Sequence, residues 1–244
     1  MQTDSTDLSA IKADRTISGR KITADYVAEA LRDAIQSGRL PDGAVLNQAA
    51  IAEHLGVSRV PVREAMRHLM AEGLIYSKAH HVAVVRTLSL ERIAELYDYR
   101  ALLEGYLTER AVPLMSDKEI EKLKAKNEEM RSTATHSVWL RLNREFHDVI
   151  LSSSGDETGM ELVEQLRLRS ERYVRMWSRG KGIHSPTEVA AEHEEIIRLV
   201  EAGKATAARA AVERHIRHTG ERVVSFGTKL EEAASVAAAP PVSA

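Results

Sequence analysis

Four glycines divide residues 21–88 into short pieces, and this spacing limits the segment to small structural elements. They are Gly38, Gly43, Gly56 and Gly73. Apolar residues recur at helical intervals before the first glycine, and two further helical patterns begin near Asn47 and at Ser58. Residues 74–85 are rich in Ile, Tyr and Val, which predicts a β-hairpin. The segment therefore predicts three short helices followed by a hairpin.

The rest of the chain carries helix signals almost throughout. Capping boxes occur at residues 116–119 and 185–188, the second with proline at the first helical position. The predicted helices span residues 90–113, 117–132, 136–152, 157–178, 186–202 and 204–234. We expect a mostly α protein, with a first domain at 21–88 and an all-helical domain at 89–236. Residues 1–20 are polar and aperiodic, which predicts a flexible arm, and residues 237–244 predict a disordered tail.

The composition excludes several classes of protein. The chain has no cysteine, which excludes disulfides and thiolate metal sites and fits a reducing cytoplasm. No apolar run is long enough to span a bilayer and the N-terminus has no signal-peptide pattern, so we expect a cytoplasmic protein with no membrane contact. Residues 1–88 hold 11 Lys and Arg against 10 Asp and Glu. Any contact with nucleic acid must therefore come from a few placed side chains rather than from a basic arm.

Two arginines lie where a winged helix-turn-helix reads DNA. That fold has three helices and a hairpin in this order, and the N-terminal residues of its third helix reach base edges in the major groove. Arg59 and Arg63 lie four apart on one face at that end, and arginine can donate two hydrogen bonds to guanine. Pro61 lies in the first turn, where its missing N–H costs nothing. The surrounding turn, cap and hairpin favour DNA contact over the alternative, a pair of solvated surface arginines.

The same segment resembles the GntR family of bacterial regulators. The matching residues are Ile35-x-x-Gly38-x-Leu40-Pro41-x-Gly43-x-x-Leu46-Asn47 and Ala52-Glu53-x-Leu55-Gly56-Val57-Ser58-Arg59-x-Pro61-Val62-Arg63-Glu64-Ala65. The resemblance implies that Arg59 and Arg63 contact an operator, and it implies a repressor that joins the nucleoid when bound. One recognition helix reads few base pairs, so we expect a homodimer on a palindromic operator.

Four further residues are candidate DNA contacts. They are Asn47, Ser58, Lys78 and His80. The last two belong to the predicted wing, whose tip reads Lys78-Ala79-His80-His81-Val82, whereas the family usually has Arg-Pro-x-Arg-Gly there. The glycine that lets a tight hairpin approach the minor groove is missing. This difference bears on which operator is bound.

In the predicted helical domain, one charged residue lies on an apolar stripe. The stripe consists of Ile93, Leu96, Leu103 and Leu107, and Arg100 lies between them. An inward charge needs a partner. From the residues alone, that partner is either a carboxylate of the protein, such as Glu104, or the anionic group of a ligand. A further helix is rich in arginine, and we expect these residues on one solvated face, from which one of them could reach a cavity. They are Arg167, Arg169, Arg172, Arg175 and Arg179.

Three histidines lie on or near apolar helix faces. His147 lies one turn after Asn143 on one predicted helix, and His193 lies on the apolar side of another. His215, on a third, is less clear, because apolar Ala211 and Ile216 lie near it but charged Glu213-Arg214 lie beside it. A lone inward histidine is more often a hydrogen-bonded core residue than a ligand. Three of them on separate helices favour a metal site with nitrogen and oxygen ligands.

The C-terminal motifs resemble the metal-binding type of FCD effector domain. They are Tyr97-x-x-Arg100-x-x-Leu103-Glu104, Asn143-x-x-Phe146-His147, Glu192-His193-x-x-Ile196 and Ala211-Val212-x-x-His215-Ile216. The resemblance implies that His147, His193 and His215 bind a divalent metal, zinc or nickel. Asn143 stands where many members carry Asp, and it can still offer its carbonyl oxygen. The resemblance also implies that Arg100 holds the carboxylate of a small effector.

Two other functions fit parts of this pattern. Three histidines on a helical fold could serve a metalloenzyme, but the His-Glu-x-x-His spacing is absent and residues 21–88 would be unexplained. A metal-free regulator that binds an acyl thioester would need an apolar cavity, which three inward histidines oppose. The sequence therefore predicts a transcriptional regulator and not an enzyme. We expect a small organic acid, bound at a metal-containing domain, to modulate its operator binding.

Overall fold

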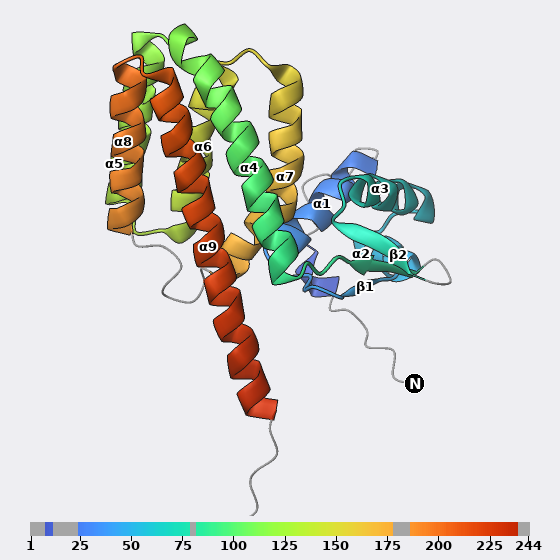
Figure 1. Ribbon diagram of the computed structural model, residues 1–244. Helices are drawn as coiled ribbons and strands as arrows, with labels where there is room; N and C mark the ends of the chain where they lie inside the picture. The colour runs from blue at the N-terminus through green and yellow to red at the C-terminus, as the bar shows by residue number, and fades with distance from the viewer. Residues whose placement is uncertain (1–7, 12–23, 79–81, 178–185, 239–244) are drawn as a thin grey trace, which may run out of the picture. The chain divides into compact units, whose positions relative to one another are not determined.

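The computed structural model describes residues 8–11, 24–78, 82–177 and 186–238 (Figure 1). Contacts within the chain divide it into two units. The first comprises Met1–Ser89 with Leu168–Arg179, and the second comprises Leu90–Arg167 with Gly180–Ala244. Leu168–Arg179 thus belong to the first unit, although the sequence placed them in the helical domain.

The first unit is a winged helix-turn-helix, as predicted. Its elements are α1 (Ala24–Gln36), β1 (Val45–Leu46), α2 (Gln48–Leu55), α3 (Arg59–Ala71), β2 (Ile75–Lys78) and β3 (Val82–Val85). The strands form an antiparallel sheet in the order β1-β3-β2, with Val45 opposite Val84 and Ile75 opposite Val85. Strand β1 was not predicted because two residues carry no measurable periodicity.

Short local signals set the boundaries of α2. Asn47 is its N-cap, and the Asn47 Oδ1 accepts hydrogen bonds from the backbone N–H of Ala49 (2.9 Å) and Ala50 (3.1 Å). Gly56 ends the helix in the left-handed conformation, with φ 66°, which glycine adopts without a steric penalty. Ser58 takes the N-cap position of α3, but its side chain makes no capping hydrogen bond among the described residues. Of these two predicted caps, the Asn47 hydrogen bonds are present and the Ser58 hydrogen bond is not.

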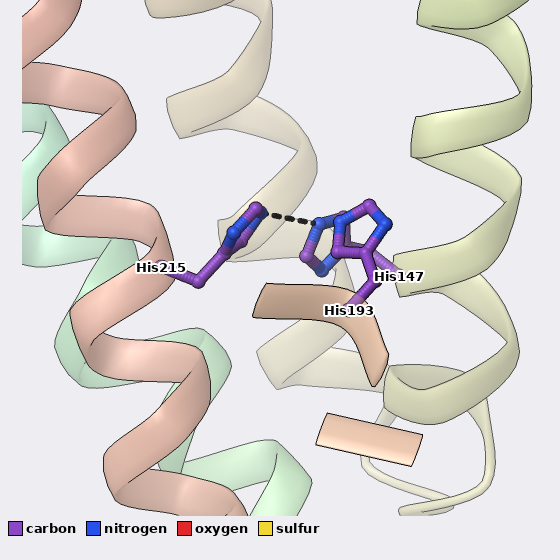
Figure 2. Close-up of side chains that lie close together, drawn as sticks. All are labelled: His147, His193 and His215. Atoms are coloured by element: carbon purple, nitrogen blue, oxygen red, sulfur yellow. Dashed lines mark hydrogen bonds between the residues drawn. The ribbon is translucent and has the colours of Figure 1, made fainter. Parts of the chain in front are cut away.

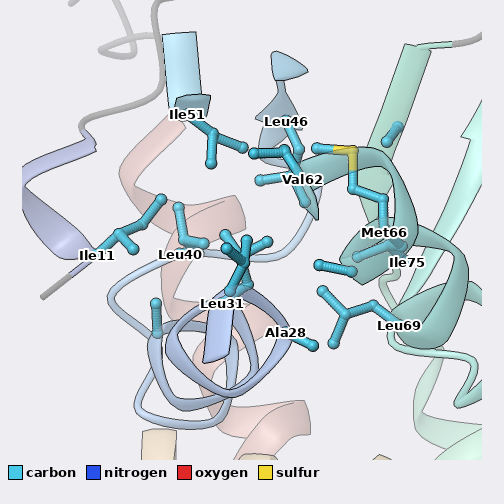
Figure 3. Packing of buried hydrophobic residues seen from close by; sticks show 14 of the residues in the cluster. Ile11, Ala28, Leu31, Leu40, Leu46, Ile51, Val62, Met66, Leu69 and Ile75 are labelled. Atoms are coloured by element: carbon cyan, nitrogen blue, oxygen red, sulfur yellow. The ribbon is translucent and has the colours of Figure 1, made fainter. Parts of the chain in front are cut away.

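The three helices and the sheet enclose one apolar core (Figure 3). Leu31 of α1, Met66 of α3 and Ile75 of β2 are all buried in it. Ile11 also joins this core, after a short 3-10 helix at Leu8–Ala10, and its carbonyl oxygen lies 3.0 Å from His54 Nε2. Leu8–Ile11 therefore differ from the expected flexible arm, because an apolar side chain there has a core to enter. The remainder of the arm lies outside the described residues.

The second unit is helical, as predicted. Its elements are α4 (Leu90–Ala111), η4 (Val112–Leu114), α5 (Asp117–Ser132), α6 (His136–Ser152), α8 (Pro186–Glu201) and α9 (Ala205–Ala238), together with the first part of α7 (Glu157–Trp177). The long helices α4 and α9 run side by side (Figure 1). Gly220 allows this approach, since a Cβ at that position would lie 2.6 Å from the Cβ of Tyr97. Helix α9 extends to Ala238, two residues into the predicted tail; residues 239–244 lie outside the described residues.

None of the described helices combines the length and the apolar character that a membrane crossing requires.

Candidate functional site

The N-terminal end of α3 presents unpaired positive charge. Arg59 and Arg63 are both exposed, and neither forms an ion pair within the described part of the chain. By contrast, Arg32 on α1 pairs with Glu72. Val60, between the two arginines, is 49% exposed. This end of α3 can therefore offer donors and an apolar contact to a partner without breaking an internal interaction.

The other predicted DNA contacts have different surroundings. Ser58 is exposed beside Arg59, and its hydroxyl is free of a capping role within the described residues. Asn47 uses its side-chain oxygen Oδ1 to cap α2, so the N–H groups of its side-chain amide are the ones available to a partner. Lys78 is exposed at the end of β2. His80 lies outside the described residues.

The structure brings together the three histidines that the sequence placed on separate helices. His147 comes from α6, His193 from α8 and His215 from α9, and the rings face a common point (Figure 2). One ring nitrogen of each lies within 4.8 Å of the others, and the Nε2 atoms of His147 and His215 are 3.2 Å apart. All three side chains are buried. Three imidazoles at this spacing could hold one metal ion.

Among the described residues, His193 and the nearby helix position Asn143 carry buried polar atoms without a hydrogen bond. Neither ring nitrogen of His193 makes a hydrogen bond among the described residues, and the same holds for the buried Oδ1 of Asn143, one turn before His147. A buried polar atom without a hydrogen bond costs free energy. Phe146 stacks on the His193 ring, with centroids 4.2 Å apart, and holds that ring in place. A bound cation would supply a partner for a ring nitrogen of His193.

Burial favours the neutral form of two of these imidazoles, those of His147 and His193. It lowers the pKa of His147 well below its usual value, and the charges of His215, Arg167 and Arg100 lower it further. Burial and the neighbouring His215 likewise lower the pKa of His193. Neutral imidazole is the form that coordinates a metal. His147 and His193 are therefore held in the ligating state by their surroundings.

Glu192 fixes the orientation of His215. Its Oε2 lies 2.6 Å from His215 Nδ1, which leaves Nε2 to face the cluster. Burial raises the pKa of Glu192, but the hydrogen bonds from His215 and His218 and the charge of Arg222 outweigh this effect, and the pKa falls to about 2. An ionised carboxylate behind a histidine is the usual support of a metal ligand. The sequence offered no sign of this role, because Glu192 is the neighbour of His193 in the chain but the partner of His215 in space.

A buried ion-pair network lies on α4, α6 and α7. Arg100 Nε donates to Glu104 Oε1 at 2.9 Å, and Arg167 donates to Glu104 Oε2 at 2.8 Å and also to Asp148. Burial raises the pKa of Glu104, but the charges of Arg167 and Arg100 outweigh it, and the pKa falls to about 2. Of the two partners that the sequence left open for Arg100, the protein carboxylate Glu104 is present. Arg167, expected on a solvated face, is instead buried.

The network lies close to the histidine cluster, since Arg100 and Arg167 both lower the pKa of His147. Its two arginines balance the two carboxylates of Glu104 and Asp148, so the network adds no net charge. A divalent cation held by neutral imidazoles would therefore leave this region positive. An anion would neutralise that charge.

Two known families match the chain. Residues 23–85 match the family described as bacterial regulatory proteins, gntR family. Residues 95–218 match the FCD domain. The first range contains α1 to β3, and the second contains the histidine cluster and the Arg100–Glu104 pair.

Relatives of the chain are transcriptional regulators. Over 207 residues it is 30% identical to the probable D-xylose utilization operon transcriptional repressor of Paenarthrobacter nicotinovorans. This alignment covers 82% of this chain and 89% of that protein. Over 100 residues it is 42% identical to the gluconate operon transcriptional repressor of Bacillus subtilis (strain 168). This shorter alignment covers 39% of this chain and 41% of that protein. A solved structure of a GntR family member from Pseudomonas syringae pv. tomato str. DC3000 matches with a TM-score of 0.54 and 28% identity over 93% of this chain and 94% of that one.

Proposed function

Because the chain belongs to the GntR family of bacterial regulatory proteins and carries an FCD domain behind its winged helix, we propose that it represses transcription under the control of a small organic acid. It is a transcriptional regulator with a DNA-binding winged helix, and its relatives are regulators rather than enzymes. The observation that carries the proposal is the buried cluster of His147, His193 and His215 beside Arg100. The acid binds there, and its binding changes the affinity for the operator.

The histidine cluster binds one divalent metal ion, zinc or nickel. The orphaned nitrogens of His193 and the orphaned Oδ1 of Asn143 support this assignment, and so does Glu192 behind His215. Nitrogen ligands with one oxygen suit both metals. With neutral imidazoles and a neutral amide as ligands, the only negative group close to the ion among the described residues would be Glu192 behind His215, and the ion would keep most of its positive charge.

The effector is a small carboxylic acid that lies between the metal and Arg100. The positive charge of the bound metal favours an anion, and Arg100 is the arginine that the FCD resemblance assigns to a carboxylate. One relative is named for the gluconate operon, and gluconate is a hydroxy acid of this class. Sugar acids and other hydroxy acids are therefore the first candidates. To control repression, the acid must bind one arrangement of the protein better than the other.

The winged helix binds a palindromic operator as a homodimer, in the cytoplasm at the nucleoid. Arg59 and Arg63 donate hydrogen bonds to base edges in the major groove of the DNA. The DNA backbone or the adjoining groove is contacted by Ser58, Asn47, Lys78 and His80. Exposure of the two arginines without internal partners supports this assignment. Two copies are needed, because one helix end of this size contacts too few base pairs for a unique site.

Replacing Arg63 with alanine should weaken specific operator binding by about ten- to a hundredfold and leave binding to random DNA nearly unchanged, because a base contact is lost. The operator is first isolated by binding-site selection with the wild-type chain, and affinities are then measured by gel shift at fixed salt. Arg131→Ala, at an exposed arginine of α5, is the control and should bind like wild type. An equal loss on random DNA would show that Arg63 contacts only phosphate.

Replacing Asn143 with aspartate should tighten metal binding at least about tenfold, because a charged oxygen then faces the cation. The affinity is measured by titration of zinc or nickel against a competing chelator. Asn47→Asp adds the same charge in the other unit and keeps a residue type that caps helices well, so its metal affinity should equal wild type. If Asn143→Asp also leaves the affinity unchanged, Asn143 is not a ligand.

A further inference from the structure

Helix α4 exposes a row of large apolar side chains. Tyr99, Leu102 and Tyr106 are 60%, 48% and 42% exposed, and their spacing of three and four residues places them on one face. The opposite face of α4 is buried and carries Arg100 and Glu104. We call Tyr99, Leu102 and Tyr106 the α4 stripe. Contiguous exposed apolar side chains of this kind mark an interaction surface.

Opposite charges lie at the two ends of the α4 stripe. Glu95 lies one turn before Tyr99, and Arg110 lies one turn after Tyr106, where its guanidinium donates to the Tyr106 hydroxyl at 3.2 Å. Both charged side chains are exposed. Arg92 precedes Glu95 by three residues and pairs with it. Along the helix, an Arg–Glu pair, three apolar residues and a positive charge therefore follow one another, with Leu102 near the middle.

We propose that α4 packs antiparallel against α4 of a second copy of this chain, about a two-fold axis near Leu102. An antiparallel copy places Tyr99 opposite Tyr106 of the other chain and Glu95 opposite Arg110 of the other chain. The ion pair then forms twice, and the two leucines meet at the axis. A partner without this symmetry would match only one end of the stripe, so the charge pattern favours a second copy over an unrelated protein.

This inference rests on the homodimer of the proposed function and names its surface. It also gives one helix two tasks, because α4 carries Arg100 on the face opposite the stripe. An acid that binds Arg100 would then act on the same helix that joins the two chains.

The test compares dimer dissociation constants of full-length variants by analytical ultracentrifugation. Leu102→Glu should weaken the dimer by more than about a hundredfold, because both leucines leave the contact and two carboxylates meet at the axis. Leu230→Glu is the matched control, since Leu230 on α9 is 45% exposed but outside the stripe, and it should dimerise like wild type. Circular dichroism should show the same helix content for both variants.

Charge reversal gives a test that does not change the apolar contact. Glu95→Arg and Arg110→Glu should each weaken the dimer, because like charges then face each other, and the double variant should restore it. If Leu102→Glu dimerises like wild type, or if the double variant gives no rescue, this surface is wrong while the proposed function stands. If the wild-type chain is monomeric at micromolar concentration with and without DNA, both the surface and the symmetric operator are wrong.

Discussion

Replacing His193 with alanine should reduce the metal content from about one equivalent per chain to less than about a tenth. One of three imidazoles is then missing from a site that otherwise has only neutral ligands, so the remaining donors cannot hold the ion. The measurement is elemental analysis of protein purified without a His-tag, with and without added zinc or nickel. His147→Ala and His215→Ala should give the same result. His136→Ala, at an exposed histidine of α6, should keep the wild-type content.

The same variants can be checked by thermal unfolding. A metal that binds only the folded chain raises its melting temperature, and a chelator removes this gain. The wild-type chain should therefore melt at a lower temperature in chelator, whereas His193→Ala should melt at the same temperature in both conditions. If wild type holds less than a tenth of an equivalent even after metal is added, the three histidines are hydrogen-bonded core residues and the metal site is wrong.

Replacing Arg100 with alanine should abolish the response of operator binding to the effector acid, while metal content and operator affinity without acid stay at wild-type values. Glu104 keeps Arg167 as a buried partner at 2.8 Å, so the loss of Arg100 does not leave that carboxylate alone. The acid itself is found by a thermal-shift screen of hydroxy, sugar and dicarboxylic acids, run with and without chelator. Operator affinity is then measured with and without the acid.

Arg131→Ala is the control for this experiment, because Arg131 is an exposed arginine on another helix, α5. It should respond to the acid like wild type. By linkage, operator DNA must change the affinity for the acid by the same factor, and Arg100→Ala should remove this effect as well. A normal response of Arg100→Ala would mean that Arg100 serves only as the ion-pair partner of Glu104, and the carboxylate between metal and arginine would be ruled out.

Much of the fold was determined by the sequence alone. The six helices after residue 89 begin and end within a few residues of the predicted positions, because capping residues and apolar spacing act over one or two turns. The winged helix followed from glycine spacing, the Asn47 cap and the Val-rich hairpin in the same way. Strand β1 and the burial of Ile11 could not be predicted, since each depends on a partner far away in the chain.

The functional site also combines features that the sequence predicted with features that depend on distant partners. Periodicity indicated that Arg100, His147 and His193 point inward and was less clear for His215, and all four side chains are buried. Only the tertiary structure decided what each one meets: Arg100 meets Glu104, and His215 meets both His147 and Glu192. It also buried Arg167 and Arg172 of the arginine-rich helix, because burial depends on the elements that pack against a helix and not on the helix's own sequence. Spacing along one helix determines the direction of a side chain, whereas its partner is set by the packing of helices that are distant in sequence.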